Sequence, residues 1–158
     1  MKFDAVYYEP AIFDYPLGRQ LREEYGDLPW IPIESHNSIR EMQEKPNDQF
    51  GHMKRNLIAG IRKTHKYVEI HKVSDYLVPY TSGCTAMCLY CYLVCNYNKC
   101  AYLRLFVNRE QMLDRIIKKG KNSGTPLTFE IGSNSDLVLE NTITGNLLYT
   151  IPRFAEEG

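Results

Sequence analysis

Apolar runs and polar segments alternate along the second half of the chain in the order strand, loop, helix, strand. The apolar run 76–80 ends at a polar turn and predicts a strand, as does the run 127–131. Apolar residues recur at helical spacing over 109–119, which predicts a helix with one apolar face. With the polar loop 132–136 that follows, this order is typical of the beginning of a βαβ series. The predicted apolar face of the helix holds Met112, Leu113, Ile116 and Ile117.

Both ends of this predicted helix carry residues suited to a helix terminus. Asn108 can cap the N-terminus through its side-chain oxygen. Lys118 and Lys119 suit the negative end of the helix dipole, and Gly120 suits the left-handed position just after the last turn. We therefore expect the helix to run from about 109 to 119.

The first 75 residues give a more interrupted pattern. A turn at 15–18 leads into a short predicted helix that ends at Gly26. The segment 27–40 contains two prolines, which remove backbone donors, and is predicted to be extended and loop-like. The segment 41–51 is polar and is predicted to be exposed, while 57–70 is predicted to contain strand-like structure.

Length and composition indicate a globular protein with one modest core. The 158 residues are 44% hydrophobic and 24% charged, which argues against intrinsic disorder. Nineteen basic residues balance 19 acidic ones, so the chain is not a protein that binds nucleic acid through bulk charge alone. The pattern changes near residue 75, and we expect a mixed α/β N-terminal extension over 1–75 and a second segment over 76–158.

The N-terminus and the longest uncharged run both point to a protein without a membrane segment. Residues 76–98 carry no charge, but Pro79, Gly83, several hydroxyls and four cysteines make the run too polar for a bilayer span. An acidic residue, Asp4, stands where an apolar signal sequence would begin. We therefore expect a cytoplasmic location.

All five cysteines lie within 17 positions, an arrangement that favours metal or redox chemistry over a disulfide scaffold. Cys84, Cys88 and Cys91 have the spacing Cys-x3-Cys-x2-Cys, so one loop could supply three thiolates to one [4Fe-4S] cluster and leave the fourth iron free. The alternative is a zinc site that adds Cys95 or Cys100 as a fourth ligand. Zinc sites commonly use pairs with two intervening residues, and only Cys88 and Cys91 have that spacing.

Three cysteines in this order, with the aromatic Tyr90 before the last one, resemble the signature of the radical S-adenosylmethionine (radical SAM) superfamily. The flanking sequence is more specific and resembles the spore photoproduct lyase family in collinear order over almost the whole chain. The stretches that carry this resemblance are 80–93, 102–108, 8–10, 15–18, 35–37, 60–64, 129–130 and 135–136.

This resemblance implies a DNA-repair lyase that reverses the spore photoproduct, a thymine dimer, directly to two thymines. A reduced [4Fe-4S] cluster would cleave S-adenosylmethionine, and the resulting 5′-deoxyadenosyl radical would abstract hydrogen from the lesion. The partners implied are DNA that contains spore photoproduct and an electron donor such as a flavodoxin or ferredoxin. The implied location is the cytoplasm of the spore core.

The resemblance also assigns roles to individual residues. The cysteines of the loop, Cys84, Cys88 and Cys91, would hold three irons, and the free iron would chelate the cofactor. Tyr92, Ser135 and Asp136 match positions that line the cofactor pocket, where a zwitterionic, hydroxylated cofactor needs hydrogen-bond partners. Tyr90 would join Tyr92 in a hydrogen-transfer relay.

The chain departs from the family pattern at one residue of the implied mechanism. Many members carry a hydrogen-donor cysteine two residues before the Ser135–Asp136 pair, and this chain has Ser133 there. A serine O–H bond is too strong to donate hydrogen readily to a thymine radical. Cys95 and Cys100 are the remaining thiols and are proposed as substitutes; the alternative is that they are small residues that pack near the cluster.

The second departure is length. A complete barrel takes about 200–250 residues, so 76–158 could supply only the first strands of one. The expected fold is therefore α/β, an incomplete (β/α) radical SAM barrel preceded by a small α/β extension. We interpret the chain as an N-terminal portion that lacks much of the lesion-contacting surface, so the parent activity is better supported than activity of this chain alone.

Two other functions compete with this one. The same cysteines could form the zinc site of a non-catalytic DNA-interaction module, or the radical chemistry could act on another substrate. Residues 54–72 carry six basic residues and one acidic residue, a stripe that suits phosphate contacts or an ordinary solvated face. Iron with acid-labile sulfide would distinguish the first function from the zinc module.

Overall fold

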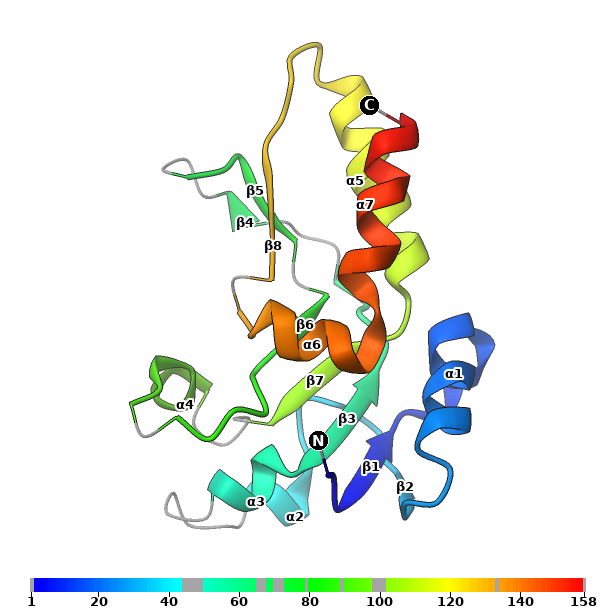
Figure 1. Ribbon diagram of the computed structural model, residues 1–158, viewed down its shortest axis with the longest axis vertical. Coiled ribbons are helices and arrows are strands. Elements are labelled where there is room, and N and C mark those ends of the chain that lie inside the picture. Colours follow the sequence, from blue (N-terminus) through cyan, green and yellow to red (C-terminus); the bar gives the residue numbers. More distant parts are fainter. Residues whose placement is uncertain are drawn as a thin grey trace.

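The computed structural model of the chain has an α/β fold (Figure 1). The residues that the structure describes are 2–43, 50–64, 68–69, 73–78, 80–88, 90–97, 102–132 and 134–157. Within them the strands are β1 Ala5–Tyr8, β2 Trp30–Pro32, β3 Asn56–Gly60, β4 Val68–Glu69, β5 Tyr76–Val78, β6 Thr81–Ser82, β7 Leu103–Phe106 and β8 Phe129–Ile131. The helices are η1 Pro10–Asp14, α1 Pro16–Glu24, α2 Arg40–Gln43, α3 Phe50–Lys54, α4 Tyr92–Tyr97, α5 Arg109–Asn122, α6 Leu137–Thr144 and α7 Asn146–Glu157.

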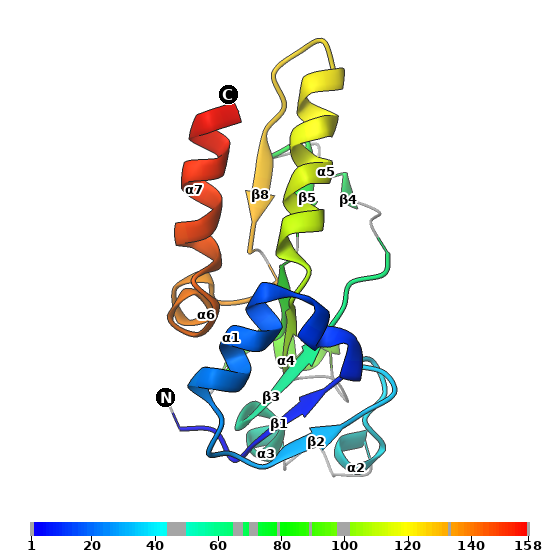
Figure 2. The same ribbon diagram turned by 90° about the vertical axis from the view of Figure 1, so that its right-hand side faces the viewer.

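The larger sheet has five strands in the order β2-β1-β3-β7-β6. The first four of these are parallel, and the short β6 runs antiparallel to β7. All five residues of β3 are buried, as expected for a parallel strand that is covered on both faces. Leu57 and Ala59 pack with residues of η1 and α1, whereas Ile58 packs with Met42 of α2 and Met53 of α3. Figure 2 shows α1 in front of this sheet.

Residues 1–75 contain more regular structure than the sequence pattern predicts. The strand β1 was not predicted, although it pairs with both β2 and β3. The helix α1 begins at Pro16, before the predicted start, because proline is tolerated in the first turn of a helix. The predicted loop contains β2, where Pro32 is acceptable because β2 lies at the edge of the sheet. The predicted exposure of 41–51 is wrong at Met42, which is buried, and residues 44–49 of that segment lie outside the described residues.

The smaller sheet has the order β4-β5-β8, and it confirms the predicted strand, helix, strand order. β5 pairs in parallel with β8, with Tyr76 opposite Phe129. Besides the predicted helix, the connection between β5 and β8 contains three further elements, β6, α4 and β7. Of these, β6 and β7 belong to the larger sheet. Because the larger sheet takes strands from both 1–75 and 76–158, those two segments share one hydrogen-bonded layer. The proposed division at residue 75 stays a prediction.

The helix α5 confirms the predicted apolar face, but its ends differ from the prediction. Three of the four predicted residues are buried, and Ile117 packs partly buried beside them. Gly120 lies inside the helix, which continues to Asn122. The Asn108 side chain makes no capping bond; it accepts from the Arg62 amide at 2.9 Å and donates to the Arg62 carbonyl at 3.1 Å. Asn108 therefore ties α5 to the segment after β3.

Two helices that the sequence pattern did not predict, α6 and α7, follow β8. α5 and α7 lie side by side in both views (Figures 1 and 2), and Arg153 of α7 forms an ion pair with Asp114 of α5 at 3.1 Å. α6 ends at Gly145, whose φ of 63° provides the left-handed cap. None of the helices in the described residues is long and apolar enough to cross a membrane.

Candidate functional site

The cysteine loop begins beside the polar loop that follows β8. The Gly83 amide donates to the Asn134 carbonyl at 2.9 Å, so residues 51 positions apart in the sequence are hydrogen-bonded neighbours. Gly83 has a φ of 84° and directly precedes Cys84. Ser135 directly follows Asn134. The structure thus brings together the start of the predicted cluster loop and the start of the predicted cofactor-binding pair.

The thiols of the loop differ in exposure. Cys84 is buried, Cys91 is half-buried, and Cys88 and Cys95 are exposed; all four are free. Cys100 lies outside the described residues. The Ala86 amide donates to Cys84 Sγ at 3.2 Å, the kind of N–H···S bond that surrounds cysteines in iron–sulfur sites. Three thiols on one loop, with a backbone donor on one sulfur, fit a [4Fe-4S] ligand set.

The three cysteines predicted as ligands are close in sequence but are not assembled into a metal site in the described residues. Within the part of the chain that the structure describes, no three Cys, His, Asp or Glu side chains are placed to hold one metal ion. The predicted relay residues on the same loop are also open to solvent, with Tyr90 97% exposed and Tyr92, the first residue of α4, 57% exposed. The structure therefore does not bring the three thiols together, and their role as cluster ligands stays a prediction.

Ser135 and Asp136 have structural partners. Asp136 is the N-cap of α6, and its carboxylate accepts from the Leu139 amide at 3.0 Å. Ser135 Oγ donates to Glu140 Oε2 at 3.0 Å. These bonds fix the loop after β8 at the N-terminus of α6, beside Gly83. Ser133, at the position of the family's hydrogen-donor cysteine, lies outside the described residues.

Glu140, which was not predicted from the sequence, links the two loops. Its carboxylate is 2% exposed and accepts from Thr81 Oγ1 at 2.5 Å, Ser135 Oγ at 3.0 Å and Asn146 Nδ2 at 2.9 Å. Thr81 belongs to β6, which leads into the cysteine loop, and Ser135 belongs to the other loop. An acidic residue within the otherwise uncharged helix 137–144 was the one sequence signal for this role.

A second buried polar group that was missed lies where β1 and β3 end. Glu9 Oε1 accepts from the His36 amide at 3.0 Å and contacts His36 Nδ1 at 2.8 Å, while Glu9 Oε2 accepts from the Ile61 amide at 3.0 Å. Burial raises the pKa of Glu9, but these hydrogen bonds outweigh it and lower the pKa below its ordinary value. Burial lowers the pKa of His36 despite the neighbouring carboxylate.

We expect the chain to lose stability as the pH falls from 7 toward 4. Because His36 has a folded pKa below its ordinary 6.5, the unfolded chain binds a proton that the folded chain does not, and stability falls below about pH 6.5. Glu9 adds a second loss below its ordinary 4.5. Urea titrations at several pH values should show a smaller loss between pH 6.5 and 5 for His36→Gln. An unchanged slope in that variant would contradict this assignment.

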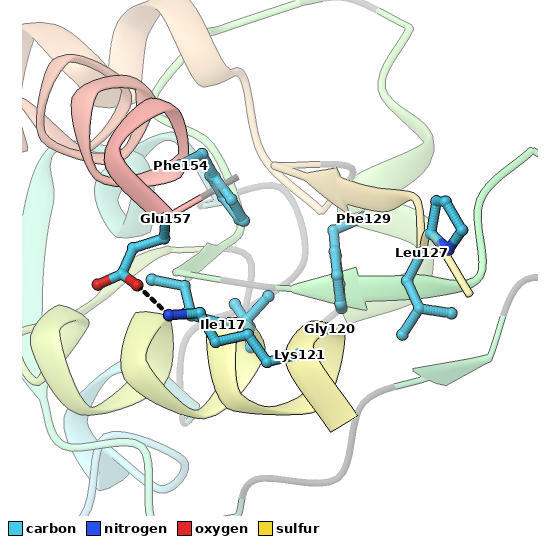
Figure 3. Close-up of a pocket in the computed structure, with 9 residues that line it drawn as sticks. Ile117, Gly120, Lys121, Leu127, Phe129, Phe154 and Glu157 are labelled. Atoms are coloured by element: carbon cyan, nitrogen blue, oxygen red, sulfur yellow. Dashed lines mark hydrogen bonds and ion pairs between the residues drawn. The ribbon is translucent and has the colours of Figure 1, made fainter. Parts of the chain in front are cut away.

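A cavity of about 400 Å³ lies away from the predicted site residues (Figure 3). It is an open pocket lined by residues of α5, α7, β8 and the segment before β8, and Figure 3 shows Phe129 and Phe154 facing it, with an ion pair between Lys121 and Glu157 at its rim. None of the predicted cysteine, tyrosine, serine or aspartate site residues lines it. Its apolar lining makes it part of the packing between the two long helices and the smaller sheet.

These features define an α/β protein with a mostly parallel five-stranded sheet and a three-cysteine loop beside a polar loop. The whole chain, residues 1–158, matches the spore photoproduct lyase family, and the protein belongs to that family. It is 33% identical over 156 residues to the spore photoproduct lyase of Bacillus subtilis (strain 168), and 31% identical over 147 residues to that of Geobacillus sp. (strain Y412MC61). The family resemblance stated from the sequence is thereby confirmed.

Solved structures agree with this assignment. A spore photoproduct lyase complexed with dinucleoside spore photoproduct superimposes with a TM-score of 0.86 at 29% sequence identity, covering 94% of this chain and 45% of that chain. A mutant with bound AdoMet and dinucleoside spore photoproduct gives a TM-score of 0.85 at 28% identity. The alignment with the Bacillus subtilis protein covers 96% of this chain and 45% of that relative. The chain thus spans a little less than half the length of the relatives that it matches.

Proposed function

We propose that this chain carries the cluster-binding and cofactor-binding part of a radical SAM DNA-repair lyase that reverses spore photoproduct to two thymines. The observation that carries the proposal is the match to the spore photoproduct lyase family over residues 1–158, which includes the three-cysteine loop. Relatives with this fold bind AdoMet and the dinucleoside lesion in solved structures, which supports the same ligands here. In this proposal, residues 76–158 form the first part of a (β/α) barrel.

Cys84, Cys88 and Cys91 would hold a [4Fe-4S] cluster through three of its irons. When bound, the cluster supplies an electron that cleaves S-adenosylmethionine to a 5′-deoxyadenosyl radical. The residues of the neighbouring loop have the polar groups to orient that cofactor: the Ser135 hydroxyl and the Asp136 carboxylate lie at the N-terminus of α6, next to the backbone of Gly83. Tyr92 would add a phenol from the start of α4.

Return of hydrogen to the product requires a donor from this chain or from the cofactor. With serine at position 133, Cys95 and Cys100 are the proposed thiol donors, and Tyr90 with Tyr92 the proposed relay. Cys95 is exposed on α4, three residues after Tyr92, so both side chains lie on the same side of that helix. This spacing supports Cys95 as the donor over a merely packed residue.

The proposed substrate is DNA that contains spore photoproduct, in the cytoplasm of the spore core. The thymine dimer would have to leave the base stack to reach the cysteine loop, just as the target base does in other enzymes that act on bases in duplex DNA. A flavodoxin or ferredoxin is the proposed electron donor.

The basic stripe 54–72 is not uniformly exposed to solvent. Lys54 is buried and cannot contact phosphates from the surface, whereas Arg55 and Lys63 are exposed.

Anaerobic reconstitution of the 158-residue chain with iron and sulfide tests this proposal. We expect a brown protein that, once reduced, releases 5′-deoxyadenosine from S-adenosylmethionine, with turnover that depends on a spore-photoproduct dinucleotide. Cys88→Ala should lose the cluster, whereas Cys95→Ala, at the proposed hydrogen donor, should retain it, so the iron content alone distinguishes these two exposed thiols. A colourless chain that binds zinc would instead support the structural zinc module. A cluster without cleavage would limit the proposal to cofactor binding.

A further inference from the structure

The last residue of α3, Lys54, is a buried lysine whose ammonium contacts the proposed cluster loop. Its side chain is 2% exposed, and Nζ donates to the carbonyl oxygen of Cys84 at 2.8 Å. The two residues are 30 positions apart in the sequence, so the bond joins α3 to the first cysteine of the loop. Neither the cysteine spacing nor the family motif includes Lys54.

A second contact shows that α3 packs against the same loop. Gly51, also in α3, lies so close to the Met87 side chain that a Cβ at this position would be 3.0 Å from the Met87 methyl carbon. Met87 lies between Cys84 and Cys88. The helix therefore supports the loop at two points, the backbone of the first cysteine and the side chain just before the second.

Among the described residues, no negative side chain compensates the charge of Lys54. In the described part of the chain no carboxylate forms an ion pair with its ammonium, and the one hydrogen bond accepts only part of its charge. A buried ammonium is costly unless a negative group lies nearby. A neutral donor would satisfy the Cys84 carbonyl equally well, so the hydrogen bond alone does not explain why a cation stands here.

An iron–sulfur cluster held by thiolates would provide such a negative charge. Nearby charge and hydrogen bonds to the ligands set the reduction potential of such clusters. Residues that hydrogen-bond to metal ligands and orient them typically contribute 10- to 100-fold to metal affinity. Lys54 combines both roles, because it donates to the backbone of a proposed ligand and brings one positive charge to the buried side of the loop.

We propose that Lys54 is a positioning residue for the cluster: its ammonium holds the Cys84 segment in place and balances the negative charge of the thiolate-bound iron and sulfide. This inference rests on the proposed function, since it requires that Cys84 be a cluster ligand. Loss of the cation should weaken cluster retention and make the cluster harder to reduce, because each added electron increases the negative charge that the site must stabilise.

The test compares three variants of the reconstituted full chain. Lys54→Met removes charge and donor, Lys54→Gln retains a donor without charge, and Arg55→Met removes a neighbouring but exposed cation that pairs with Asp4 at 2.8 Å. The readouts are iron release to a chelator, the midpoint potential from an EPR-monitored titration, and urea denaturation of the apo chain. We expect Lys54→Met to release iron about 10-fold faster than the wild type, with a more negative midpoint potential. Arg55→Met should match the wild type in both readouts.

Lys54→Gln separates the two parts of the proposal and covers a failure of Lys54→Met to fold. It should retain iron better than Lys54→Met but keep the more negative midpoint potential. Wild-type iron release and potential in both folded Lys54 variants, or in Lys54→Gln if Lys54→Met does not fold, would overturn the Lys54 proposal and leave the proposed function intact. A wild-type chain that assembles no iron–sulfur cluster would overturn both.

Discussion

Gly83→Ala should destabilise the chain by about 2 to 4 kcal/mol, because the substitution combines backbone strain with a collision. Gly83 has a φ of 84°, a conformation that side-chain-bearing residues rarely adopt. An added Cβ would also lie 2.2 Å from the carbonyl oxygen of Tyr102, whose side chain is fully buried at the start of β7. The Gly83 backbone cannot move away from Tyr102 without straining the bond from its amide to the Asn134 carbonyl.

Gly124→Ala is the matched control for this substitution. Its φ is 69°, but nothing lies within 4 Å of the Cβ that alanine would add, so only the conformational strain of about 1 kcal/mol is expected. Urea denaturation of the two apo variants gives the difference directly. Equal losses in both would contradict a tight approach between the cysteine loop and β7. A larger loss in Gly83→Ala would establish that approach without reference to any cluster.

The sequence predicted the parts of the fold that depend on local pattern. The face of α5 repeats at helical spacing, and the strands on either side of it are short apolar runs, so both could be recognised. The strand β1 was not predicted, because its four residues, followed closely by the turn at Pro10, are too few to show a clear alternation of apolar and polar positions. The order of the strands in the sheet could not be predicted either, since β7 pairs with β3, which lies more than 40 residues earlier in the sequence, as in the pair Leu57 and Leu103.

The same distinction applies to the candidate site. The three cysteines could be found because their ligand spacing is local, and the family match then followed from the flanking residues. Glu140 and Lys54 could not be found in this way, since each acts on a partner 30 or more positions away in the sequence. Both are charged residues that tertiary packing buries, and only their partners in space reveal what they do.

Glu140→Leu should cost about 2 to 5 kcal/mol of unfolding free energy, because it leaves buried donors without an acceptor. Thr81 and Asn146 are each 1% exposed and donate to the Glu140 carboxylate at 2.5 and 2.9 Å, and Ser135 donates to it at 3.0 Å. Leucine fills similar space but accepts none of these bonds. Glu140→Gln should lose less, about 1 kcal/mol, since its amide oxygen still accepts and the hydroxyls can rotate toward its nitrogen.

Glu156→Gln is the control for the Glu140 variants, since it removes one carboxylate from the exposed surface of α7 and should leave stability unchanged. Denaturation of the apo chain measures the fold, and binding of S-adenosylmethionine to the reconstituted chain measures the site. If Glu140 holds the β6 end of the cysteine loop and the Ser135 loop together, Glu140→Gln should weaken cofactor binding by more than its small loss of stability accounts for. Cofactor affinity unchanged in Glu140→Gln would confine the residue to folding. A joint loss would mean that the carboxylate couples two loops that only the tertiary structure brings together.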